Sequence, residues 1–183
     1  MAALWLAAPS APAVAEVPNG NINLLVGNRK LVDSGWTGRG DSQNYTLGID
    51  FDYTSPGWSM SLYAGLAGYR DNSAAVNLET NLDVKEIFIG PRIYLGQPGG
   101  FIRPYLGGGV DLMNVSLDST VDLNVTKDSA TNTAYFLNAG VVFNFLGFIN
   151  VGLDARWIGG TGAHNRVSVM DYYQGSFVVG FSL

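Results

Sequence analysis

Apolar and polar residues alternate with a period of two along most of this chain. The clearest stretch runs from Gln43 to Thr54, where the odd positions are apolar and the even positions include Asp50 and Asp52. Successive side chains of an extended strand point to opposite faces, so this pattern predicts a strand with one apolar and one polar face. The same alternation recurs in seven further segments, which we place at 21–31, 58–67, 86–95, 102–112, 135–145, 149–157 and 173–183.

The connections between these segments alternate in length. Tight turns are predicted at Ser55–Gly57, Gln97–Gly100 and Leu146–Gly147, where proline and glycine supply the backbone angles that such turns need. The other connections are polar and longer, and we expect loops at 32–42, 70–81, 114–131 and 159–171. Eight strands joined alternately by short turns and long loops are the layout of an outer-membrane β-barrel.

One segment tests the alternative of a transmembrane helix. Residues 134–153 contain no charged side chain and are long enough to cross a bilayer as a helix. Their polar residues Asn138, Asn144 and Asn150 are six positions apart, so a helix would point the three amides in three directions. A pair of strands places all three amides on one face. The pattern therefore favours strands.

The apolar face of the predicted strands is banded, with aromatic residues near both ends and aliphatic residues between them. Amphipathic rings at both interfaces and an aliphatic band between them are typical of a membrane barrel. A soluble barrel with an apolar interior is the alternative, and it does not require this banding. The predicted girdles comprise Tyr45, Phe51, Tyr53, Trp58, Tyr135, Phe143, Phe145, Trp157, Tyr173 and Phe181.

Most charged residues of the strands lie on the opposite face, which eight strands turn toward an interior just wide enough for side chains. Because charges removed from water persist only when paired, we predict two layers of salt bridges instead of an open pore. The predicted lumen network comprises Arg29, Asp50, Asp52, Glu86, Arg92, Arg103, Asp111, Asp154 and Arg156. Inward glycines leave room for the inward aromatic residues Tyr63, Phe88, Tyr94, Tyr105 and Phe136. Lys85 alone falls on the apolar face, next to a loop, from which it can snorkel toward lipid headgroups.

Composition excludes several other classes of protein. Charged residues make up only 14% of the 183 residues and hydrophobic residues 47%, which excludes a disordered chain. The net charge of −5 provides no basic surface for nucleic acid. Cysteine is absent and histidine occurs once, so cysteine-based zinc or redox sites and histidine-rich metal centres are excluded. We therefore predict no metal and no cofactor.

The first 15 residues form a separate segment. Ala2–Ala8 is nearly all apolar, and Ala13-Val14-Ala15 fits the cleavage site of a secretory signal peptide. A basic stretch is missing before the apolar one, which points to a truncated signal, and a flexible Ala/Pro tail is the alternative. We accordingly divide the chain into a signal peptide at 1–15 and an outer-membrane barrel at 16–183.

Three segments resemble the small outer-membrane barrels of Gram-negative bacteria, the OmpA, OmpX and OmpW type. They are Ile89–Leu95, Arg103–Val110 and the final strand, Phe177–Leu183. The resemblance implies an all-β, eight-stranded antiparallel up-and-down transmembrane β-barrel, with its long loops extracellular and its turns and termini periplasmic. It also implies contact with outer-membrane lipids and lipopolysaccharide. The barrel-assembly machinery would recognise the final strand, although this strand ends in Leu183 where an aromatic residue is usual.

We predict a monomeric, non-enzymatic barrel with a structural or surface-interaction role and a side-chain-filled lumen. The alternative is a porin-like, narrow OmpW-like channel for small or hydrophobic solutes. A lipid A-modifying enzyme is a third hypothesis, but deacylases of this size carry a His-x-Ser pair. The only histidine here, His164, has its nearest following serine at Ser168, so we predict no catalytic residues. Arg39-Gly40-Asp41 matches an integrin-binding tripeptide, and we attribute so short a match to chance.

Overall fold

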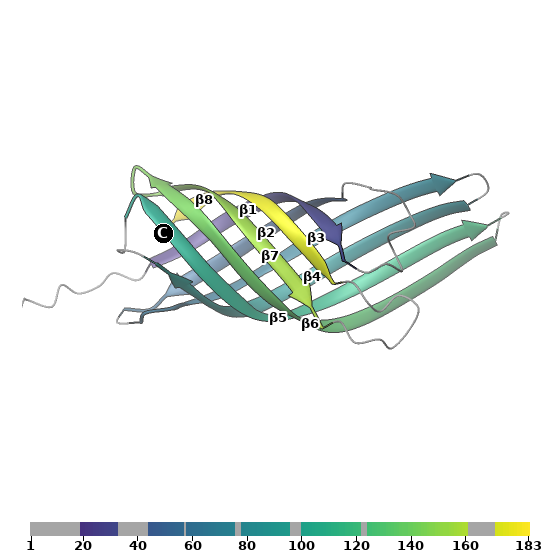
Figure 1. Cartoon of the computed structure of the whole chain (residues 1–183), viewed down its shortest axis with the longest axis horizontal. Helices are drawn as coiled ribbons and strands as arrows, with labels where there is room; N and C mark the ends of the chain where they lie inside the picture. The colour runs from purple at the N-terminus through teal and green to yellow at the C-terminus, as the bar shows by residue number, and fades with distance from the viewer. Residues whose placement is uncertain are drawn as a thin grey trace, which may run out of the picture.

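The computed structural model describes residues 19–32, 44–56, 58–75, 78–95, 100–121, 124–160 and 171–183. Its strands are β1 (Asn19–Leu31), β2 (Asn44–Thr54), β3 (Ser61–Ala75), β4 (Leu78–Tyr94), β5 (Ile102–Val121), β6 (Asn124–Phe145), β7 (Ile149–Gly159) and β8 (Tyr172–Ser182). Each strand pairs with the next, and β1 pairs with β8, so the sheet closes into a barrel (Figure 1). This confirms the predicted eight-stranded antiparallel barrel. The predicted signal peptide lies outside the described residues.

Short turns connect the strands at the end of the barrel where the chain finishes (Figure 1). Between β6 and β7 the amide of Phe148 donates to the carbonyl oxygen of Phe145 over 3.2 Å. Leu146 and Gly147 both have positive φ, 56° and 79°. Two positive φ angles in succession give the turn a twist that matches that of the flanking strands. No helix within the described residues is long and apolar enough to cross a membrane.

The barrel turns its apolar face outward. Leu47 and Leu137 are each 60% exposed, whereas Asp50 is 2% and Arg103 is 5% exposed. Burying charged groups while exposing large aliphatic side chains would be unfavourable in water. Each exposed aliphatic side chain lacks the stabilisation of about 1.5–3 kcal/mol that its burial would provide. This arrangement is the reverse of a soluble barrel and fits a wall surrounded by hydrocarbon.

Two hairpins, β3–β4 and β5–β6, extend well beyond the other strands at the opposite end of the barrel (Figure 1). The β3–β4 ladder continues to the pair Ala75 and Leu78, and the β5–β6 ladder to the pair Val121 and Asn124. The prediction of long loops at 70–81 and 114–131 was therefore wrong, because most of these residues continue the strands.

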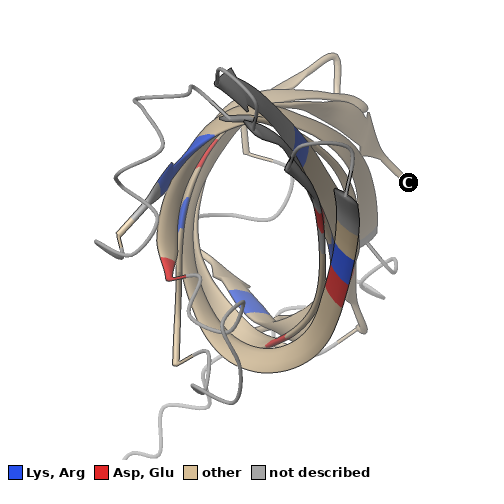
Figure 2. Cartoon of the chain, turned by 90° about the vertical axis from the view of Figure 1, so that its right-hand side faces the viewer, with Lys and Arg blue, Asp and Glu red and all other residues tan. Residues whose placement is uncertain are grey.

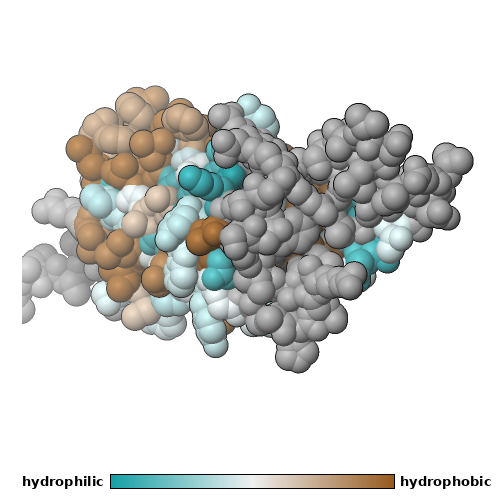
Figure 3. All heavy atoms as spheres, turned by 45° about the vertical axis from the view of Figure 1, so that its right-hand side comes forward, coloured by the Kyte–Doolittle hydropathy of each residue, from teal (hydrophilic) through white to brown (hydrophobic). Residues whose placement is uncertain are grey.

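The extended part of the hairpins reverses the polarity of the alternation. Val84 and Met113 point inward and are buried, whereas their chain neighbours Lys85 and Asn114 are exposed. Below this level the outward residues are mostly apolar, and the charged residues of the strands point inward. The sequence analysis recognised strands by their apolar outward positions. It therefore ended these strands where the outward positions become polar, although the strands themselves continue. Figure 3 shows apolar residues gathered toward the turn end and hydrophilic residues nearer the hairpin end.

Candidate functional site

The interior of the barrel contains a cluster of charges near the turn end. On β4, the Arg92 guanidinium lies between two acids of β2, with Nη1 2.9 Å from Asp52 Oδ2 and Nη2 3.2 Å from Asp50 Oδ2. The side-chain amides of Asn21 and Asn23 donate to Asp52 and Asp50, each over 2.7 Å. All five side chains are buried. Ions held this far from water are stable only when they are paired and hydrogen-bonded.

A second ion pair lies nearer the hairpin end. Arg29 of β1 donates to both carboxylate oxygens of Glu86 on β4, over 2.7 and 3.0 Å. Gln174 Oε1 accepts a further bond from Arg29 over 2.9 Å, and the Tyr172 hydroxyl donates to Glu86 over 2.7 Å. The pair therefore ties strands β1, β4 and β8 together across the lumen. Figure 2 shows charged segments on different sides of the barrel wall.

The other four residues of the predicted lumen network are buried inside the barrel but make no ion pair with any described residue. Neutral groups contact three of them, whereas neither carboxylate oxygen of Asp111 has a hydrogen-bond partner among the described residues. Asp154 accepts hydrogen bonds from the Tyr105 hydroxyl over 2.7 Å and from the Asn138 amide over 2.9 Å. The guanidinium of Arg103 lies 4.1 Å from the centre of the Tyr94 ring, close enough for a cation–π contact. These four residues are Arg103, Asp111, Asp154 and Arg156.

An aromatic cluster fills the middle of the lumen. The ring centres of Tyr63, Phe88 and Phe136 lie 5.2 to 6.0 Å from one another, and all three side chains are at most 1% exposed. Arg156 donates to the Tyr63 hydroxyl, and its guanidinium lies 3.9 Å from the centre of the Phe88 ring. Asp111, which is fully buried, stands in register with Phe88 on the neighbouring strand. The three rings therefore pack against one another inside the barrel.

Toward the hairpin end the interior becomes apolar. The apolar side chains around the Arg29–Glu86 pair belong to the same buried cluster as the aromatic rings, and those given below are at most 4% exposed. Apolar surroundings exclude water from the ion pair and strengthen the electrostatic attraction there. These members of the cluster include Leu82, Val84, Met113, Val115, Ala134 and Ile158.

Sequence reasoning missed an amide and hydroxyl network at the seam between the first and last strands. Asn21 Oδ1 accepts from the Asn150 amide over 2.9 Å and from the Ser182 hydroxyl over 2.8 Å. The Asn144 amide donates to Asn150 and to Ser182, each over 3.0 Å. Asn144 and Asn150 both occupy even-numbered positions, which indicated that they share one face of the sheet. This alternation does not identify their hydrogen-bond partners on distant strands. The network thus links β1, β6, β7 and β8.

The predicted girdle residues lie on the outside of the wall. Nine of the ten are exposed, and the exception, Phe143, is half-buried. Phe101, which the sequence analysis did not include, lies 5.9 Å from Phe143 and 5.2 Å from Phe145 between ring centres. Phe101 therefore extends the aromatic ring at the turn end.

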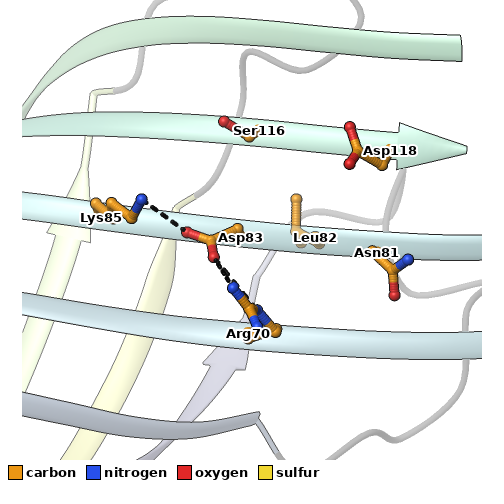
Figure 4. Close-up of a pocket in the computed structure, with 7 residues that line it drawn as sticks. All are labelled: Arg70, Asn81, Leu82, Asp83, Lys85, Ser116 and Asp118. Carbon is orange, nitrogen blue, oxygen red and sulfur yellow. Dashed lines mark hydrogen bonds and ion pairs between the residues drawn. The ribbon is translucent and has the colours of Figure 1, made fainter.

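A charged patch occupies the outer face of the extended strands β3 to β6, and we define it as Arg70, Asp83, Lys85, Asp118 and Lys127. Arg70 Nη2 lies 2.8 Å and Lys85 Nζ 3.9 Å from the Asp83 carboxylate (Figure 4). Lys127 Nζ is 3.5 Å from Asp118. All but Lys127 line a shallow groove across β3, β4 and β5, together with Asn81, Leu82 and Ser116.

In the part of the chain that the structure describes, no group of three or more acidic or histidine side chains is placed to hold a metal ion. His164 and the Arg39-Gly40-Asp41 tripeptide lie outside that part.

Comparison with known proteins identifies the family. A model described as "Outer membrane protein beta-barrel domain" matches residues 1–183, the whole of the chain. The chain belongs to this outer-membrane β-barrel family. The resemblance to small Gram-negative outer-membrane barrels is thereby confirmed, and the family supports a location in the outer membrane. No curated protein sequence matches this barrel.

Solved structures of small outer-membrane barrels share its fold. One is Ail, the attachment invasion locus protein of Yersinia pestis, with TM-score 0.61 and 12% identity over 91% of this chain and 97% of that one. Neisserial surface protein A follows with TM-score 0.59 and 14% identity over 91% and 96%. The N-terminal barrel domain of Pseudomonas aeruginosa OprF has TM-score 0.56 and 14% identity over 89% and 97%. Identities this low establish the fold alone.

Proposed function

We propose that this protein is a non-enzymatic, monomeric outer-membrane barrel that presents its two long hairpins outside the cell for structural or surface interactions. The observation that carries this proposal is the reversal of polarity along β3 to β6. Val84 and Met113 are buried while Lys85 and Asn114 are exposed, which is the pattern of a sheet in water. The hairpins therefore suit contact with soluble or lipid-linked partners above the apolar layer.

The free side of β6 provides a surface for such contacts. Among the described residues, β6 pairs with β7 only from Tyr135 onward, whereas its earlier part, from Asn124, pairs with β5 alone. An unpaired strand edge offers a row of backbone donors and acceptors to an extended partner chain. Residues 126–129 and Thr131 on this strand are exposed and polar. This composition keeps the edge soluble, and no described strand other than β5 pairs with its backbone there.

The orientation can be tested with single cysteines, because the natural chain has none. Lys127→Cys is placed on the extended hairpin, and Leu146→Cys is placed in a tight turn where the leucine is 85% exposed. We expect a membrane-impermeant maleimide to label Lys127→Cys on intact cells and to label Leu146→Cys only after the outer membrane is permeabilised. Labelling of Leu146→Cys alone on intact cells would reverse the proposed orientation.

The alternative of a solute channel predicts a different electrical behaviour. The buried Tyr63–Phe88–Phe136 cluster supports a barrel without a continuous aqueous path. We therefore expect that planar bilayers containing the purified protein show no sustained, selective conductance above that of a protein-free bilayer. A robust selective current that changes in Arg103→Ala or Asp111→Ala would favour the channel. Lipid A mass profiles that change in His164→Ala would likewise favour the enzyme hypothesis.

A further inference from the structure

We propose that Asp111 and Arg156 enclose a buried water site, in which water joins the carboxylate to the guanidinium as a water-mediated ion pair. Both side chains lie in the interior of the barrel, at 0% and 2% exposure. Neither of them makes a direct ion pair with any described residue. The site goes beyond the proposed surface role, because it concerns the closed interior.

The polar atoms that lack partners at this site complement one another. Among the described residues, neither Oδ1 nor Oδ2 of Asp111 has a hydrogen-bond partner, and the same holds for Nε and Nη1 of Arg156. Asp111 thus presents two acceptors and Arg156 two donors. A buried water molecule makes about three hydrogen bonds to groups of this kind. It accepts from the guanidinium and donates to the carboxylate, which gives both charged groups the hydrogen bonds that burial requires.

Arg156 is the cation that remains to balance Asp111. The charged groups that act on the Asp111 carboxylate are those of Glu86, Arg156 and Arg29. Glu86 already accepts hydrogen bonds from Arg29 and Tyr172, over 2.7 to 3.0 Å. Both terminal nitrogens of Arg29 are therefore committed to other partners, since its Nη2 also donates to a glutamine of β8. This leaves the Arg156 guanidinium as the counter-charge of Asp111.

The aromatic cluster holds Arg156 short of direct contact with the carboxylate. Its Nη2 donates to the Tyr63 hydroxyl, and its guanidinium carbon lies 3.9 Å from the centre of the Phe88 ring. Phe88 is the register partner of Asp111 on β4, so the guanidinium lies close to the level of the carboxylate. On the other flank, the register partner of Asp111 is Ala134, whose side chain is a single methyl group. This small side chain favours space for a water molecule beside the carboxylate.

The charges around the site favour water over a bound ion. A cation would meet the guanidinium groups of Arg156 and Arg29, and an anion would meet the carboxylates of Asp111 and Glu86. Apolar surroundings strengthen both repulsions. Water is neutral and both accepts and donates, so it suits a gap between a guanidinium and a carboxylate.

A high-resolution crystal structure of the natural protein tests the site directly. We expect a density peak at hydrogen-bond distance, about 2.7–3.2 Å, from both an Asp111 oxygen and an Arg156 nitrogen. Crystals grown with rubidium bromide should give no anomalous signal at this position. A rubidium or bromide signal there would show that an ion occupies the site. That result, direct contact of the two side chains, or water bound to Arg29 instead of Arg156 would each overturn the proposal.

Urea unfolding in neutral micelles at pH 7 gives a second test. We expect Asp111→Leu to raise the equilibrium constant for unfolding about 100-fold, because the Arg156 guanidinium then loses both its counter-charge and its water. Asp111→Asn keeps a polar group for the water and loses only the charge, so we expect a rise of about tenfold. Adding Arg156→Met to Asp111→Leu removes both charges and should recover at least tenfold of the loss.

The matched control is Met113→Leu, which alters packing at the next inward position of β5 without changing charge. It should change the unfolding constant by at most about tenfold. A carboxylate with neither water nor partner would behave in the opposite way, since leucine would then stabilise the barrel. An unchanged or lower unfolding constant in Asp111→Leu, or equal stability of Asp111→Asn and the natural protein, would overturn the proposal. Neither test depends on the orientation of the barrel or on the role of its hairpins.

Discussion

Replacing Arg92 with methionine is expected to lower the free energy of unfolding by about 3–5 kcal/mol. The change leaves the carboxylates of Asp50 and Asp52 buried, at 2% and 0% exposure, without their counter-charge. The matched control is Arg70→Met, which breaks another arginine–aspartate pair in a side chain that is 70% exposed. There we expect a loss of at most about 1 kcal/mol. Urea unfolding in neutral micelles, followed by tryptophan fluorescence, measures both.

A rescue variant separates the charge effect from simple loss of packing. Combining Arg92→Met with Asp50→Asn and Asp52→Asn removes the uncompensated carboxylates, so most of the lost stability should return. Recovery of less than half of the loss would show that the packing of Arg92 between the rings of Tyr63 and Tyr105, 3.6 and 4.4 Å away, matters more than its charge. Equal losses in Arg92→Met and Arg70→Met would contradict the prediction.

Gly109→Ala is expected to destabilise the barrel by about 3 kcal/mol, because β4 and β5 approach closely at this point. A Cβ atom on Gly109 would lie 2.1 Å from the carbonyl oxygen of Ile89, and a Cβ on Gly90 would lie 2.0 Å from that of Gly108. Backbone atoms of a closed barrel cannot move aside as a flexible side chain can. The clash therefore forces the two strands apart.

Gly175→Ala provides the control, since a Cβ there would meet no atom within 4 Å. We expect its stability to stay within about 0.5 kcal/mol of the natural protein. The fraction of protein that migrates as the compact, unboiled form in SDS gels gives a first measurement, and urea midpoints give the free energies. Similar behaviour of the two alanine variants would show that the strands have room at Gly109.

The sequence predicted the barrel wall because a period of two is a property of each strand alone. Leu47, Leu137 and Asp50 could be assigned to their faces without knowing which strands are neighbours. The number of strands and the tight turns follow from the same local signals. Closure of the sheet follows from this. In lipid, the backbone groups of the first and last antiparallel strands can find hydrogen-bond partners only by pairing with each other.

The lumen contacts could not be predicted in the same way. Parity assigns Arg156 and Asp154 to the interior but does not give their partners, which depend on the stagger between strands and the width of the barrel. The structure pairs Arg29 with Glu86 across the lumen, whereas Arg103 and Arg156 lie on aromatic rings. The hairpin extensions were missed for a different reason. Beyond the apolar layer the outward positions become polar, so the pattern used to recognise strands stops although the extended backbone continues.

The contacts inside the barrel join strands that are distant in the chain. Arg29 on β1 meets Glu86 on β4, and Asn150 on β7 meets Asn21 on β1. In a flat, unrolled sheet these groups would have no partners, and hydrocarbon would impose about 2.5–3.5 kcal/mol for each arginine or aspartate at mid-depth. These contacts exist only in the closed barrel, so closing the sheet before it enters the bilayer avoids this cost.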